Sequence, residues 1–140
     1  MLKKYIRYRS LFIWHMKATL KNYRQAPRKV RLLADLVRGK DVGRAILALE
    51  FTEKRAAAPI AKLIRSAIAN AEGKGISRAR LFISDIRVDK GVTMKRWMPK
   101  AFGRATPINK RTSNLVVALS ERTEEVKEKQ KKKKEKTEKA

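Results

Sequence analysis

A stretch of 26 residues, from 89 to 114, separates two segments that both have the pattern of a β-strand. Residues 80–88 alternate apolar and polar side chains, and residues 114–119 are almost continuously apolar. Neighbouring strands are usually joined by about two to five residues, so a structureless loop of this length would be exceptional. We therefore expect both strands to continue through 89–114 as a β-hairpin arm. Its tip is expected within residues 99–107, where Gly103 supplies turn freedom.

The predicted arm is too long for its own body to bury. About ten residues on each side would extend roughly 30 Å, whereas a body of about 100 residues has a radius of gyration near 13 Å. Trp97, Met98 and Phe102 should therefore lie outside the core. An isolated two-stranded ribbon is marginal in water, so we expect the arm to order fully only against a partner. The alternative is a hairpin folded back on the body with Trp97 as its anchor, which would crowd many like charges together.

The charge of the chain indicates what that partner is. The chain has 37 Lys or Arg, 13 Asp or Glu and a net charge of +24, which destabilises a compact fold unless a polyanion neutralises it. In the arm, Asp89 is the single acid, and basic residues interleaved with Trp97 and Phe102 suit phosphates and exposed base faces. The arm has seven cations: Lys90, Lys95, Arg96, Lys100, Arg104, Lys110 and Arg111. Nucleic acid is the leading predicted partner.

Helical periodicity predicts about three helices before the first long strand. One runs from Pro27 to Arg38 with Gly39 as its left-handed cap, one from 41 to 50, and one from Thr52 to 72. Pro59 lies in the early turns of the last helix, so either its true start is nearer residue 57 or the helix kinks there. With a short strand at 19–23, the predicted fold is α+β: a small antiparallel three-stranded sheet packed against the helices, with a long protruding hairpin arm.

The first helix is predicted to have two functional faces. Its apolar stripe is expected to face the core: Val30, Leu32, Leu33, Leu36 and Val37. A second face carries Arg28, Arg31 and Arg38, and Asp35 is expected to pair with Arg31 or Arg38. The alanine-rich third helix is predicted to pack in the core, which argues against a membrane-surface role for it.

The two ends of the chain differ from the patterned region at 16–122. Residues 1–15 carry four basic residues and no acid, and represent either a true basic extension or a start codon assigned too early. No apolar run reaches the length of a membrane span, so a soluble intracellular protein is expected. Residues 123–140 are rich in Lys and Glu and are expected to be disordered.

Catalysis is not expected. The chain lacks Cys, its one histidine (His15) precedes the patterned region, and no phosphate loop, Rossmann glycine pattern or metal-ligand cluster is present. Asp85 and Asp89 are expected to contact Arg87 or Lys90 rather than to act together. No cofactor is therefore predicted. A basic architectural DNA-binding protein with a β-arm remains the main alternative, although such proteins are usually dimers and no apolar dimer seam is evident.

Several motifs resemble one known family in order along residues 16–122. They are RQAPRKVR at 24–31, ADLVRGK at 34–40 and SAIANAE at 66–72, then VDKG, MKR, PKA, GRA and KRTS between 88 and 113. Jointly they are similar to the bacterial large-subunit ribosomal protein L-twenty-two family. The resemblance implies a structural, non-enzymatic protein of the cytoplasmic ribosome, present in one copy. It also implies assembly with 23S-type rRNA and neighbouring large-subunit proteins.

The resemblance further implies where each part of the chain lies. The body would sit near the exit of the nascent-peptide tunnel, and the hairpin would run through rRNA until its tip lines the tunnel and meets the nascent polypeptide. The expected tip residues are Met98, Pro99, Lys100, Ala101, Phe102, Gly103 and Arg104. The expected rRNA-binding residues are Arg24, Arg28, Lys29, Arg31, Arg38, Lys40, Lys95, Arg96, Trp97, Lys100, Arg104, Lys110, Arg111, Thr112 and Ser113.

Overall fold

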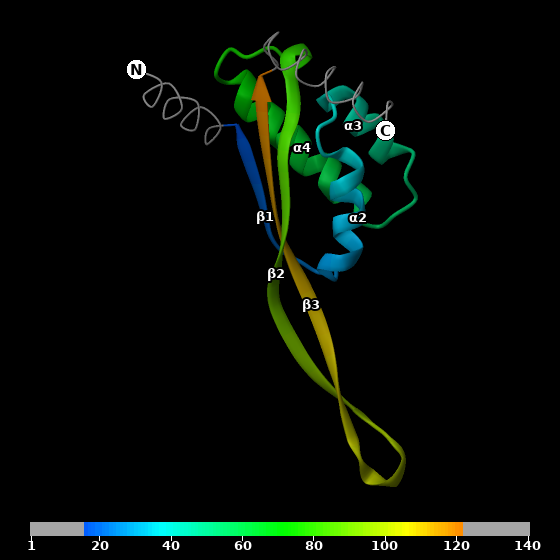
Figure 1. Cartoon of the computed structure of the whole chain (residues 1–140). Helices are drawn as coiled ribbons and strands as arrows, with labels where there is room; N and C mark the ends of the chain where they lie inside the picture. Colours follow the sequence, from blue (N-terminus) through cyan, green and yellow to red (C-terminus); the bar gives the residue numbers. More distant parts are fainter. Residues whose placement is uncertain (1–15, 122–140) are drawn as a thin grey trace, which may run out of the picture.

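The computed structural model describes residues 16–121, which form a three-stranded sheet, three α-helices and a long hairpin arm (Figure 1). The predicted extension at 1–15 and the Lys/Glu-rich tail at 123–140 lie outside these residues. In chain order the elements are β1 (Lys17–Tyr23), α2 (Pro27–Val37), α3 (Val42–Glu50), α4 (Ala57–Glu72), β2 (Leu81–Pro99) and β3 (Ala105–Glu121). The strand order is β1-β3-β2 with both pairings antiparallel, which confirms the predicted α+β class.

The core lies between one face of the sheet and the three helices, which Figure 1 shows on the same side of the strands. Alternation along the strands sends every second side chain toward the helices, as a half-covered sheet requires. The strands contribute Ile83, Ile86, Val88, Leu115, Val117 and Leu119 to this core. The helices contribute, among others, Val30, Leu33, Val37, Leu49, Ile60 and Ile64.

The predicted width of the apolar stripe on α2 was wrong. Leu32 is 69% exposed and Leu36 is 38% exposed, whereas Val30, Leu33 and Val37 are buried. The sheet and α3 cover only one side of α2, and the i, i+3, i+7 positions already fill that side. Leu32 and Leu36 therefore lie on the uncovered side of the helix.

The helix ends follow the positions of proline and glycine. Pro27 is the first residue of α2, and Gly39 adopts a left-handed φ of 73° just after it. The last helix begins at Ala57 rather than at Thr52, with Pro59 in its first turn. A proline is tolerated there because the first N–H groups of a helix have no partner within it.

Both long strands continue into the arm, which extends away from the body (Figure 1). Trp97 pairs with Pro107 and Met98 with Thr106, so the ladder persists almost to the tip. The turn itself contains Phe102, whose φ is 58° and which is 99% exposed. A projecting arm is thus confirmed, and the alternative of a hairpin packed against the body is not what the structure contains.

Candidate nucleic-acid interface

The body and the arm meet at a junction that we call the neck, formed by residues 22–31, 90–94 and 110–114. A bulge interrupts the β2–β3 pairing here: Lys90 pairs with Ser113 and Thr93 with Arg111, so two residues of β2 face Thr112 alone. Such a bulge bends the ribbon and increases its twist. The neck is therefore the place where the direction of the arm is set.

Buried hydroxyl groups hold the neck together. Thr112 is 4% exposed and its Oγ1 donates a hydrogen bond to the carbonyl of Val92, at 2.7 Å. Ser113 is fully buried and its Oγ donates to the carbonyl of Gln25. The Ser113 contact connects the loop before α2 to the base of the arm, and the Thr112 contact joins β3 to the bulge of β2. The sequence predicts an RNA contact for each of these residues, but both hydroxyls are used inside the protein, and we infer that they support the neck instead.

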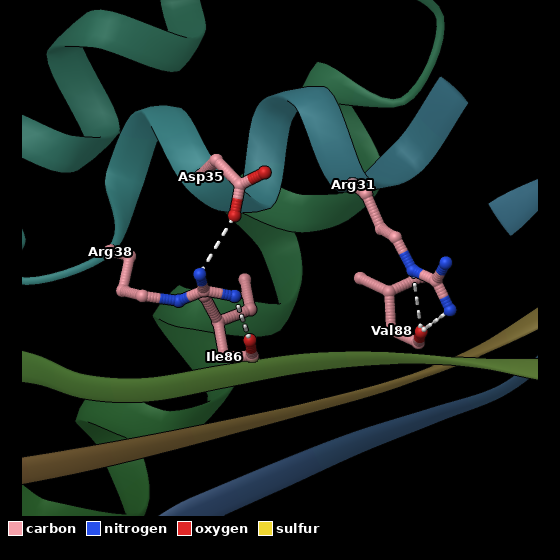
Figure 2. A network of polar contacts seen from close by, with 5 residues as sticks. All are labelled: Arg31, Asp35, Arg38, Ile86 and Val88. Carbon is pink, nitrogen blue, oxygen red and sulfur yellow. Dashed lines mark hydrogen bonds and ion pairs between the residues drawn. The ribbon is translucent and has the colours of Figure 1, made fainter. Parts of the chain in front are cut away.

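Two predicted RNA-binding arginines, Arg31 in α2 and Arg38 just after it, cap the free edge of β2 (Figure 2). Arg31 donates from Nε and Nη2 to the carbonyl of Val88, at 3.2 and 3.0 Å, and Arg38 donates from Nη2 to the carbonyl of Ile86, at 3.0 Å. Asp35 forms an ion pair with Arg38 at 2.8 Å, as one of the two predicted pairings. An edge strand leaves alternate carbonyls unpaired, so these guanidinium groups satisfy and shield them. Each guanidinium still has donors left for an RNA contact.

Two cation-lined grooves open at the neck on either side of Lys29. Neither groove has an acidic residue in its lining. The first, of about 630 Å³, is lined by Arg24, Gln25, Ala26, Lys29, Arg55, Met94, Lys110 and Arg111. The second, of about 520 Å³, is lined by Ala26, Pro27, Arg28, Lys29, Arg31, Lys90 and Arg111. The start of α2 also faces these grooves, and the N-terminal end of a helix favours anions.

The ion pairs of the described residues do not neutralise the positive charge of the neck and the arm. Within residues 16–121 they join Asp35 to Arg38, Asp41 to Arg44, Glu50 to Arg65, Glu121 to Arg80, and Asp85 to Arg87, the last as predicted. All five pairs lie on the body. The cations of the two grooves and of the outer arm, which we define as residues 95–109, have no acidic partner in this part of the chain, so their charge is available to an external polyanion.

The outer arm presents further predicted contact residues on two faces. Cross-strand pairs share a face, so Lys95 with Asn109 and Trp97 with Pro107 lie on one side of the ribbon. Arg96 with Ile108 lies on the other side. Trp97 is 67% exposed and has no core to fill. Each face of the arm therefore combines cations with exposed apolar surface, a combination that suits phosphates and stacked bases.

The remaining predicted RNA-binding residues lie in two places, beyond the end of α2 and at the tip of the arm. Lys40 lies with Arg38 beyond the end of α2 that is remote from the neck, so the pair is not part of the grooves. Lys100 and Arg104 flank the turn at the tip, and the Lys100 N–H donates to the Arg104 carbonyl. Arg55 was missed as a groove residue, because it reaches the neck from the loop before α4 and no local pattern marks it. It is placed there by Tyr23, whose hydroxyl lies 3.3 Å from the Arg55 carbonyl.

Residues 16–121 contain neither a metal-ligand cluster nor a helix able to span a membrane. Between residues 16 and 121, no group of three or more His, Cys, Asp or Glu side chains is arranged to hold a metal ion. In the same part of the chain, no helix has both the length and the apolar character that a membrane span requires. The neck, the two faces of the arm and the tip each carry exposed cations.

The chain is similar in sequence to known proteins. The family model described as ribosomal protein L22p/L17e matches residues 18–120. A large ribosomal subunit protein uL22 from Lactobacillus helveticus is 49% identical over 109 residues, which cover 77% of this chain and 93% of the relative. The uL22 of Pelotomaculum thermopropionicum is 49% identical over 109 residues, covering 77% and 96%. That of Syntrophotalea carbinolica is 50% identical over 107 residues, covering 76% and 97%.

Proposed function

The chain belongs to the ribosomal protein L22p/L17e family, and from that premise we propose that it binds 23S-type rRNA through the neck and the arm. As a member of this family it is a structural, non-enzymatic protein of the large ribosomal subunit, located in the cytoplasmic ribosome. One observation supports the rRNA contact most directly. The ion-paired cations lie on the body, whereas the groove and outer-arm cations have no acidic partner within residues 16–121.

The proposed mechanism is charge neutralisation with release of counterions. Cations that replace the counterions around RNA phosphates make binding depend steeply on salt, with about 0.7 to 0.9 units of log-log slope for each phosphate. The body and the arm would thereby hold several rRNA segments together as the subunit assembles. One copy per ribosome, beside other large-subunit proteins, is part of the proposal.

We propose further that the tip, Met98 to Arg104, lines the tunnel through which the nascent polypeptide leaves. The arm can reach away from the body because residues 95–111 are all exposed and contribute nothing to the core. The turn is closed on itself by the Lys100–Arg104 contact, so it can keep its shape without support from the body.

The rRNA proposal is tested by binding of the purified chain to 23S rRNA and to duplex DNA of equal length, across a series of salt concentrations. We expect tighter binding to the rRNA and a steep linear fall of log K with log salt. Stronger binding to duplex DNA would favour the architectural DNA-binding alternative. A flat salt response would remove phosphate neutralisation as the source of affinity.

The tunnel proposal needs a separate test in assembled ribosomes. A photo-crosslinking amino acid at Phe102 should reach a stalled nascent chain, whereas the same group at Leu47, exposed on α3, should not. Crosslinks from Phe102 to rRNA alone would reject the tunnel position but leave rRNA binding intact. Equal crosslinking from both positions would reject the orientation of the arm.

A further inference from the structure

The two basic grooves of the neck share three lining residues, which come from both the body and the arm and which we call the ridge. Lys29 of α2, Arg111 of β3 and Ala26 line both grooves. We propose that one strand of rRNA backbone crosses this ridge with phosphates in both grooves, and that this strand fixes the direction of the arm relative to the body. The inference rests on the proposed rRNA binding, and it specifies where a strand lies and what its binding does.

The chemistry of the grooves fits a nucleotide backbone. Each holds several hundred cubic ångströms, which is the size range of small-molecule sites. Their linings combine cations with a few apolar groups, Met94 in the first groove and Pro27 in the second. A simple anion would occupy only a small part of either groove. A strand with sugars between its phosphates would occupy both.

The position of the ridge explains why binding would orient the arm. Lys29 belongs to the body and Arg111 to the base of the arm, so a strand that contacts both residues bridges the two parts. At this level the described chain connects arm and body through β2 and β3, through the Ser113 contact with Gln25, and through the contacts of β1 with Ser113 and Asn114. The bulge between Lys90 and Thr93 lies at the same place and lets the ribbon bend. RNA in the grooves would add a further connection across that bend.

Affinity provides the first test. The double variant K29Q/R111Q removes the ridge charges, and K62Q/K74Q removes the same charge from exposed positions on and just after α4. We expect the ridge variant to bind 23S rRNA at least about tenfold more weakly, with a salt slope smaller by roughly 1.4 to 1.8. The control should stay within about twofold of the parent. If ridge and control variants behave alike while the parent binds rRNA, the neck inference fails, whereas rRNA binding by the chain stands. Failure of the parent to bind rRNA would instead reject the proposed function.

Orientation provides the second test. Because the chain contains no cysteine, Leu47→Cys on α3 and Ala105→Cys beside the tip can carry two spin labels without interference. Saturating 23S rRNA should narrow the distance distribution between the labels in the parent. In the K29Q/R111Q background, at an rRNA concentration that saturates this variant too, the distribution should stay broad. Equal narrowing in both backgrounds, or no narrowing in the RNA-bound parent, would overturn the orienting role.

Discussion

Gly91 lies so close to Thr112 on the neighbouring strand that a Cβ at position 91 would overlap the Thr112 hydroxyl. That hydroxyl is fixed, because it is buried and donates to the Val92 carbonyl. The β2 bulge thus depends on a residue without a side chain, and the hydroxyl occupies the space that this leaves. The neck is assembled around this contact.

Replacement of Gly91 by alanine should therefore open the neck. The added methyl group forces Thr112 or the bulge to move, which costs about 1–3 kcal/mol of stability in a tightly packed site. Urea unfolding followed by circular dichroism measures the change. Gly43→Ala is a matched control, since nothing lies within 4 Å of its Cβ position in α3. That variant should gain about 0.5–1 kcal/mol, because alanine suits a helix better than glycine. Equal effects at both positions would contradict the steric explanation.

The Thr112 hydroxyl should matter for stability and not for contact with RNA. In Thr112→Val the Val92 carbonyl loses its donor, and the free energy of unfolding should fall by about 1–2 kcal/mol. Thr112→Ser keeps the hydroxyl, so its free energy of unfolding should fall by less. Binding to 23S rRNA, measured at a temperature where all three proteins are folded, should agree within about twofold. A folded valine variant with strongly reduced rRNA affinity would return Thr112 to the set of direct contacts.

Arg31 and Arg28 are three residues apart on α2. Variants of the two should show that edge capping depends on Arg31 and RNA binding on Arg28. Arg31 donates twice to the Val88 carbonyl, whereas no side-chain hydrogen bond or ion pair of Arg28 occurs within residues 16–121. Arg31→Ala should lower stability by about 1–3 kcal/mol, as expected for a charged hydrogen bond to an edge carbonyl. Arg28→Ala should change stability by less than about 0.5 kcal/mol and should weaken rRNA binding. Thermal melts measure the stability of both variants, and filter binding measures their affinity for rRNA. Reversed effects would reject this division of roles between the two arginines.

The sequence predicted the architecture better than it predicted the roles of individual side chains. The arm was predictable because two strand patterns flank 89–114, a segment too long for a loop and too charged for a core. The starts of the helices were predictable because Pro27 and Pro59 act locally. Edge capping by Arg31 was not predictable, since it depends on which strand α2 packs beside. The exposure of Leu32 likewise depends on how much of α2 its neighbours cover, and local periodicity carries no information about that.

Removal of the outer arm should leave the body intact and take away much of the affinity for rRNA. Residues 95–110 are all exposed and Met94 is half-buried, so replacing Met94 to Lys110 with an Asn-Gly turn removes no fully buried side chain. The midpoint of urea unfolding should therefore change little, because the core between the sheet and the helices is untouched. The deletion takes away five cations: Lys95, Arg96, Lys100, Arg104 and Lys110. If each neutralises one phosphate, the salt slope of rRNA binding should decrease by up to about 4. A truncated chain that unfolds at much lower urea would show that the arm supports the body, and an unchanged salt slope would show that the arm does not bind RNA.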